Sequence, residues 1–197
     1  FSTTGTVEIP GLGFSAAFQV APGEVVTIAL PREADLSFSS DQITQKGIHV
    51  TATAEISVYG VSRAVESTDA FLALPTNILG TEHIVLGYQN LDVNPGVFET
   101  FPGTEFAIVA TEDGTNVTIT PSVTTGTHAA GVPYLITLDA GETYLLQNTG
   151  VEATDLSGTI ISSDRPIAVF GGHAAANIPA PAVNYADYLV EPLFPVS

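Results

Sequence analysis

Residues 105–121 read EFAIVATEDGTNVTITP, and this stretch decides how the rest of the chain is interpreted. Two runs rich in Val, Ile, Thr and Phe, the residues that favour strands, flank the dipeptide Asp113-Gly114. Asp-Gly is a common turn dipeptide because glycine adopts positive φ angles readily. The stretch therefore predicts a strand, a turn and a returning strand.

Similar short runs continue along the chain, and Gly, Pro, Asn and Asp separate them about every ten residues. No segment has the pattern of an amphipathic helix of useful length, so the sequence predicts an all-β fold. The predicted strands cover residues 6–9, 16–20, 24–30, 48–53, 55–61, 82–89, 105–111, 116–120, 134–138, 142–147, 158–162 and 166–171.

An internal repeat organises these strands. FQVAPGEVVTIAL aligns with LITLDAGETYLLQ, which places Gly23 on Gly141, and both glycines are expected in tight turns. GIHVTATAEISVYG aligns with GTIISSDRPIAVFG, GTVEIP with GTNVTITP, and the segment that begins at Asp69 with the one that begins at Asp187. The blocks keep one order in both copies, which predicts two tandem β-sandwich units. The predicted units are residues 1–98 and 99–197, with a junction near residues 95–102.

Each predicted unit contains one strand that has no counterpart in the other unit. The strand in GTVEIP has no counterpart of residues 105–111 before it, where only Phe1, Ser2, Thr3 and Thr4 stand. The second copy lacks a counterpart of residues 82–89. An incomplete sandwich exposes unpaired backbone groups, so these four residues are predicted as a strand-exchange edge between subunits. A longer chain that fills the gap, or a rearrangement that seals the edge, is the alternative.

The charge balance excludes several partners. The chain has 197 residues, of which 45% are hydrophobic, so it can form a sizeable core. Its 21 acidic and four basic residues give a net charge of −17, which repels nucleic acids and anionic membranes. No apolar run is long enough to insert into a membrane. Cationic partners and divalent ions remain compatible with this charge.

Compartment is inferred from residue usage. There is no cysteine, so disulfides and zinc–thiolate sites are excluded. The scarcity of lysine, together with abundant Thr, Ser, Gly and Val, is typical of bacterial or archaeal surface proteins. We therefore expect an extracellular or cell-surface location.

The sequence shows no constellation that would carry catalysis. Its four histidines stand alone, and no metal-binding or nucleophile motif is present, so we predict that the chain is not an enzyme. His173 follows the pair Gly171-Gly172 and is the candidate ligand-binding residue. Glu112 and Asp113 are weak candidates for calcium ligands, and an exposed hairpin turn is the favoured explanation for them. No other cofactor is expected.

Several motifs together resemble the IgG-Fc-binding protein N-terminal domain family. They are DAFLALPTNILGTEHIVLGYQ, FAIVATEDGTNVTITP, GETYLLQ, DLSGTIISSDRPIAVFGGHAAANIP and DYLVEPLFPVS, which lie between residues 47 and 197. Within that family the chain resembles the bacterial or archaeal surface-protein branch. The resemblance implies an extracellular binding or structural module without catalytic residues. The family pattern has cysteines where this chain has Ala175 and Ala186, and it continues beyond PVS.

Two functions follow from these observations. The first is a non-catalytic adhesive or ligand-binding module whose partner is a protein or a glycan at a cell surface. The alternative is a structural subunit that assembles with copies of itself into an extracellular fibre or coat by strand exchange. An enzyme on a β scaffold, such as a glycosidase, is the third and least supported possibility.

The resemblance makes a testable prediction for Ala175 and Ala186. If the disulfide geometry of the family is retained, their Cα atoms lie about 4.4–6.8 Å apart. The double variant A175C/A186C should then oxidise in air and raise the melting temperature relative to its reduced form. Thiol titration and thermal unfolding measure both effects. Free thiols that persist after air oxidation would contradict the positional match.

Overall fold

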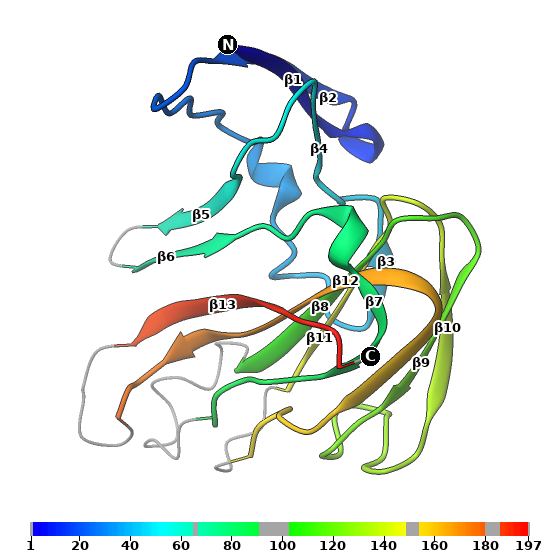
Figure 1. The fold of residues 1–197 in the computed structure, drawn as a ribbon. Helices are drawn as coiled ribbons and strands as arrows, with labels where there is room; N and C mark the ends of the chain where they lie inside the picture. The colour runs from blue at the N-terminus through cyan, green and yellow to red at the C-terminus, as the bar shows by residue number, and fades with distance from the viewer. Residues whose placement is uncertain (1, 65–66, 91–102, 149–153, 180–185, 197) are drawn as a thin grey trace.

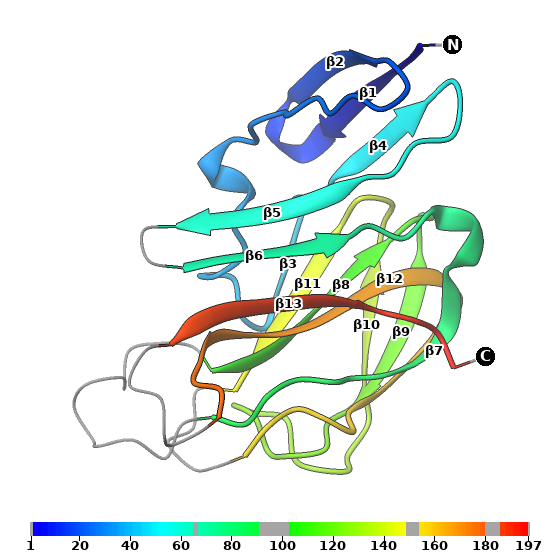
Figure 2. The ribbon, with the colours of Figure 1, turned by 60° about the vertical axis from the view of Figure 1, so that its left-hand side comes forward.

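The computed structural model describes residues 2–64, 67–90, 103–148, 154–179 and 186–196. It confirms the all-β fold: antiparallel sheets and three single-turn 3-10 helices make up the regular structure of the described residues. No helix among them is long and apolar enough to cross a membrane. Figures 1 and 2 show a large curved sheet, a hairpin against it and a smaller sheet beyond the hairpin.

The large sheet is built around β12 (Ile160–Ala176). The first part of β12 pairs with β9 (Thr115–Thr120) and β7 (Gly80–Ile84), and its second part pairs with β8 (Thr104–Ala110) and β13 (Asp187–Leu193). β10 (Tyr134–Leu138) continues the sheet beyond β9, and β11 (Thr143–Gln147) continues it beyond β8. Since one turn joins β10 to β11, the two ends of the sheet lie close and the sheet is nearly closed (Figure 1).

Apolar side chains fill the inside of this curved sheet. Alternate residues of each strand point inward, and burying them is the main favourable term in folding. The buried cluster comprises Val85, Phe106, Ile108, Ala110, Val117, Ile119, Leu138, Tyr144, Leu146, Leu156, Ile161, Ile167, Val169 and Leu193.

The turn predicted at Asp113-Gly114 does not reverse the chain, so the predicted hairpin is wrong. β8 and β9 both pair antiparallel with β12, at successive positions of it, and therefore run in the same direction. The backbone bends between them where Gly114 has φ +66°. β12 bends at the same place, and Thr111 Oγ1 donates to the carbonyl of Pro166 at 2.9 Å. Both runs favour strands, but their common partner lies far away in the sequence.

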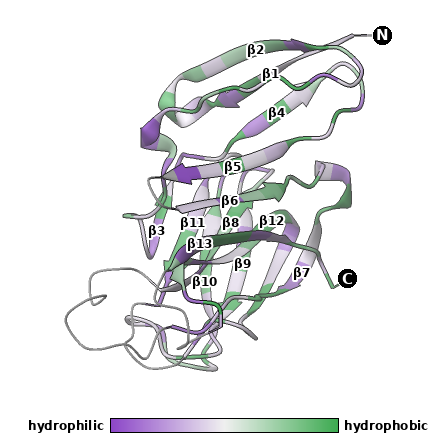
Figure 3. Cartoon of the chain, turned by 90° about the vertical axis from the view of Figure 1, so that its left-hand side faces the viewer, coloured by the Kyte–Doolittle hydropathy of each residue, from purple (hydrophilic) through white to green (hydrophobic). Residues whose placement is uncertain are grey.

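Beyond the large sheet lie two smaller ones. β1 (Thr3–Ile9) pairs with β2 (Phe14–Val20) on one edge and with β4 (His49–Ala52) on the other. β5 (Tyr59–Ala64) and β6 (Ser67–Leu72) form a hairpin. Exposed and partly buried residues alternate along β2, the pattern of a half-buried strand, and Figure 3 shows the hydropathy of its residues.

Two aspartates attach the hairpin to the large sheet. Asp187 Oδ1 accepts hydrogen bonds from Ser67 Oγ (2.7 Å) and Thr68 N (3.0 Å). Asp69 Oδ2 accepts from Val190 N at 2.8 Å. These contacts advance in the same direction along both strands, so β6 and β13 lie parallel. Side-chain carboxylates join them in place of a backbone ladder.

Other strand predictions need correction. Residues 24–30 and 55–58 have no strand partner among the described residues, although their β-branched side chains favour strands. Residues 158–162 and 166–171 were expected as two strands, whereas one strand, β12, runs from Ile160 through both. Three further strands, β3 (Gln42–Thr44), β6 and β13, were not predicted from the sequence.

The two-unit division stays a prediction. Its boundary at residue 98 and its junction at residues 95–102 lie outside the described residues. The sheet pairing gives the boundary no support, because β7 comes from the first proposed unit and pairs with β12 of the second. Ala176 pairs with Asp187, so Ala175 and Ala186 lie on adjoining segments, and the predicted crosslink between them remains to be tested.

The matched turns at Gly23 and Gly141 are confirmed. Gly23 has φ +80° and Gly141 φ +78°, and the residue after each donates to the carbonyl three positions earlier, as in type II turns. Such turns splay the strands on either side of them. This explains why β10 and β11 pair with different neighbours and why residues 24–30 do not return along β2.

Gly141→Ala should lower the free energy of unfolding by about 1 kcal/mol or more. A Cβ at Gly141 would meet no atom within 4 Å, so the cost is that of the positive φ angle alone. Gly141→Asn should cost less because asparagine tolerates this conformation. Urea denaturation of both variants measures the difference, and an alanine variant as stable as the parent would contradict the assignment.

Candidate functional site

The predicted binding residue His173 is buried. It lies in β12 between β8 and β13 with 2% of its surface exposed. Its Nδ1 accepts a hydrogen bond from Ala175 N at 3.0 Å, and its Nε2 has no partner among the described residues. Burial lowers the pKa of His173 to about 4, against the smaller opposite effect of Asp155. The side chain is therefore a neutral interior group with no surface for a ligand.

The candidate calcium ligands are engaged elsewhere. Asp113 Oδ1 accepts from Ala140 N at 3.0 Å, and the carbonyl of Asp113 accepts from Arg165. Glu112 lies 4.0 Å from the same guanidinium group. No cluster of three or more potential metal ligands occurs among the described residues. A neighbouring arginine disfavours a cation here, so this arrangement does not support calcium binding.

The predicted strand-exchange edge lies inside a sheet. Phe1 is outside the described residues and Ser2 precedes β1. Thr3 and Thr4 belong to β1, the central strand of its sheet, where Thr3 is buried and bonded to Thr53 Oγ1 at 3.0 Å. The open edges of this sheet belong to β2 and β4 instead.

One polar cluster connects an aspartate, a histidine and two tyrosines. Asp41 has an uncommon positive φ of 57°, and its Oδ1 accepts from Tyr144 Oη at 2.7 Å and lies 2.9 Å from His128 Nε2. Tyr134 Oη is 2.9 Å from Tyr144 Oη, and its ring stacks on His128 with centroids 3.7 Å apart. Sequence reasoning missed this cluster because its members come from three separate segments.

The chemistry of this cluster indicates a structural role. Burial raises the pKa of Tyr134 to about 12 and raises the pKa of Tyr144 further, so both remain protonated at neutral pH. A protonated phenol is not a base, so the two hydroxyls act here as hydrogen-bonding groups. Asp41 N also donates to the carbonyl of Leu145 at 2.7 Å. The cluster therefore fastens the segment around Asp41 to β11.

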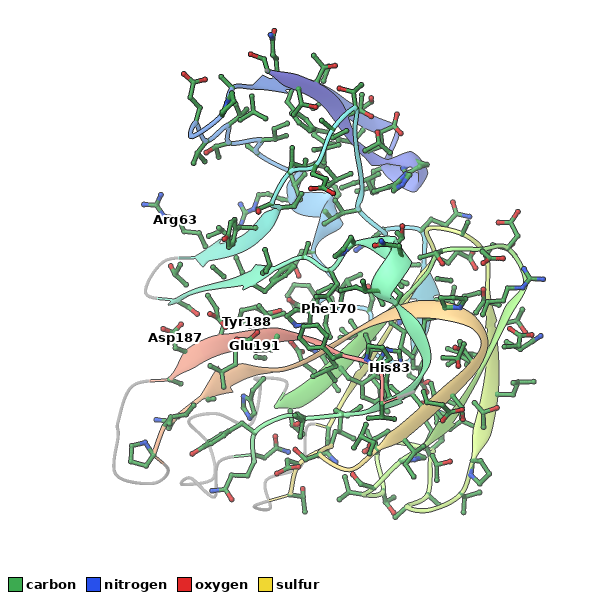
Figure 4. All side chains as sticks on the ribbon, in the orientation of Figure 1. Arg63, His83, Phe170, Asp187, Tyr188 and Glu191 are labelled. Atoms are coloured by element: carbon green, nitrogen blue, oxygen red, sulfur yellow. The ribbon has the colours of Figure 1, made fainter. Side chains whose placement is uncertain are left out.

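Figure 4 labels side chains of the hairpin and the neighbouring strands, some of which point inward and others into solvent. Phe170 packs edge-on against Phe71 of β6 with centroids 5.1 Å apart. Arg63 extends from β5 into solvent. His83 of β7 is buried, burial lowers its pKa, and neither ring nitrogen has a partner among the described residues. His83 is therefore not accessible to a ligand, and the partly buried Phe71 and Phe170 pack the hairpin against β12.

An accessible concave surface lies on the sheet of β1, β2 and β4. A shallow, open groove crosses these strands. Most of its lining is apolar surface, and threonine hydroxyls and one amide lie within it. Thr6 Oγ1 and Thr51 Oγ1 are 2.9 Å apart across β1 and β4. The groove is lined by Thr4, Gly5, Thr6, Ala17, Phe18, Gln19, Thr51, Ala52 and Thr53.

One part of the groove, the spacing of its threonines, could have been anticipated from the sequence. Thr4 and Thr6, like Thr51 and Thr53, are two residues apart, and this spacing puts each pair on one face of a strand. Their meeting across β1 and β4 could not be read from the sequence, because it needs the pairing of residues 45 positions apart. Of these four threonines, Thr4 alone was among the site residues predicted from the sequence.

Comparisons with known proteins give a family. A family model described as IgGFc binding protein matches residues 69–197. The human IgGFc-binding protein is 30% identical over 188 residues, which cover 90% of this chain and 3% of the human protein. The chain thus spans about 3% of the length of this relative. No solved structure matches. These matches do not support the bacterial or archaeal branch predicted from composition.

Glu105 should make the stability of the fold depend on pH. Its carboxylate is buried in β8, where Gln147 Nε2 donates to it at 2.6 Å. Burial raises the pKa of Glu105 to about 7, and Asp35 adds to this. The folded state therefore holds the proton more tightly than the unfolded chain. The associated stability is complete below about pH 4.5 and falls by about 3 kcal/mol as the pH rises through 7.

Glu105→Gln keeps a hydrogen-bond acceptor and removes this ionisation. The variant should match the parent near pH 4.5 and exceed its free energy of unfolding at pH 8 by up to about 3 kcal/mol. The control Glu191→Gln removes an exposed carboxyl from the neighbouring strand β13. Urea titrations at both pH values test this, and parallel profiles for Glu105→Gln and the parent would contradict it.

Proposed function

Because the chain belongs to the IgGFc-binding protein family, we propose that it is a non-catalytic extracellular module that binds a protein ligand. The family is named for binding and not for catalysis. The observation that carries the proposal is the groove on the sheet of β1, β2 and β4. Its hydroxyl and amide groups stand on paired strands, which hold them in place for contact with a partner.

Charge supports a basic partner surface. The net charge of −17 attracts a positively charged ligand, and only four basic side chains would repel it. Attraction between opposite charges accelerates association. An IgG Fc fragment is the first ligand to test, because the human relative is named for it. The groove precedes residues 69–197, so the family match does not itself assign it. The alternative to a protein ligand is a glycan at a cell surface. Binding of either ligand could serve adhesion.

A fibre or coat subunit is the second candidate function. β2 is an edge strand of seven residues. Charged residues and prolines normally protect an edge strand from pairing with another chain, and β2 contains neither. Residues 24–30 have no strand partner within the described ranges, and Val25 is 91% exposed. Strand exchange at such edges would join copies end to end. A mass that grows with concentration would favour this function over the first.

Thr51→Lys should weaken binding at the groove. A lysine at this exposed position fills the groove and opposes a basic ligand, so the dissociation constant should rise at least about tenfold, or 1.4 kcal/mol. Thr127→Lys makes the same change of charge on an exposed loop elsewhere and should bind like the parent. Surface plasmon resonance with immobilised chain, against Fc and Fab fragments and a soluble glycan, provides the measurement.

Equal affinities of Thr51→Lys and Thr127→Lys would rule out the groove as the site. The same titrations in EDTA and in calcium chloride test the calcium hypothesis for Glu112 and Asp113. We propose that binding needs no cofactor, so the two series should coincide.

A further inference from the structure

The sheet of β1 repeats part of the large sheet. The order β2-β1-β4 matches the order β10-β9-β12, and every pair in both is antiparallel. The same type of turn follows β2 and β10, at Gly23 and Gly141. The hairpin of β5 and β6 likewise matches the second part of β12 with β13.

Two aspartates support the correspondence between the β5–β6 hairpin and the pair formed by β12 and β13. Asp69 and Asp187 occupy aligned positions of the repeat, in β6 and β13. Each carboxylate accepts the backbone N–H of its own following residue, and each also accepts a backbone N–H from the other strand. β6 and β13 therefore carry an aspartate at the same position of the repeat, and each aspartate makes the same two kinds of hydrogen bond. We treat the two strands as corresponding elements of the repeat.

The copies differ at one strand. In the large sheet, β8 lies between β12 and β11 and pairs with both. In the N-terminal half, residues 25–29 align with β11 but have no partner among the described residues. Val25 and Val26 are 91% and 46% exposed, whereas their counterparts Thr143 and Tyr144 are 1% and 2% exposed. β5 is the counterpart of the second part of β12, and among the strands that the structure describes it pairs only with β6.

We propose that residues 24–30 and the free edge of β5 flank a vacant strand position that accepts an extended strand like β8. The flanking residues are Val25, Val26, Ile28 and Leu30 on one side and Tyr59 and Val61 on the other. Of these, Tyr59 and Val61 are 67% and 63% exposed. An unpaired run of β-branched residues promotes aggregation unless a strand covers it. The occupant is uncharged along its centre and apolar at alternate positions, as β8 is.

The connection from β8 to β9 identifies the source of this strand. β8 continues into β9 in the same direction through only four residues, 111–114. A strand in the equivalent place would enter β1 through a similar short link, so the donor is polypeptide attached directly before Phe1. The human relative is many times longer than this chain, which fits a module embedded in a longer polypeptide. The inference does not rest on the proposed ligand.

An added strand tests the proposal. Residues 104–114, TEFAIVATEDG, are duplicated in front of Phe1, and a second extension carries the same residues in scrambled order. Hydrogen–deuterium exchange of the amides in residues 25–29 and 59–63 should slow at least tenfold with the first extension only. The melting temperature should rise by several degrees. Exchange of β12 amides reports that the fold is intact in all variants.

Val26→Pro supplies the matched variant. Val26 is exposed and has no strand partner among the described residues, so proline there should leave the unextended chain unchanged. Its counterpart Tyr144 belongs to the alternate residues of β11 that face β8, so proline removes a donor that the added strand needs. It should abolish the slower exchange in the extended protein.

Three results would overturn the proposal. The ordered and scrambled extensions could act alike, or residues 25–29 could already be protected in the monomeric, unextended chain. The unextended chain could also protect them only as a concentration-dependent dimer seen by light scattering, which would make a second copy the occupant. None of these results bears on binding at the groove, so the two proposals can fail separately.

Discussion

The fold depends on the pairing of β12 along both of its edges. Four strands, β7, β8, β9 and β13, hydrogen-bond to its 17 residues, and each half of β12 has a partner on either side. A strand of this length can serve both parts of a curved sheet only if it bends. The bend falls at residues 164–166, where Asp164 accepts hydrogen bonds from the backbone and side-chain amides of Asn116. The core then forms inside the curve.

The buried polar groups follow from this close packing. Glu105 and His173 sit on strands with neighbours on both edges, so their side chains are enclosed whatever their polarity. Burial disfavours the charged form of each, which raises the pKa of the carboxyl and lowers that of the imidazole. These shifts describe an interior that tolerates polar groups. Burial is the largest cause of both shifts, so the shifts by themselves are not evidence of catalysis.

The N-terminal third contrasts with the large sheet. Its strands β1, β2 and β4 carry exposed threonines on one face, and residues 24–30 have no strand partner in the described part of the chain. Both of the proposed interaction surfaces lie in this third. The groove offers side-chain contacts on the face of the sheet, whereas residues 24–30 and β5 offer backbone groups at its edges. These are different modes of recognition, and one module can use both.

The sequence alone determined the all-β class, the acidic surface and the turns at Gly23 and Gly141, because alternation, charge count and glycine requirements are local properties. The family was recognisable from its motifs for the same reason. Only the tertiary structure decided that the run through Asp113 continues forward and that His173 is interior. It also decided that residues 24–30 stay unpaired and that four threonines share one groove. Strand pairing joins residues far apart in the chain, and a strand-forming run carries no information about which partner will be available to it.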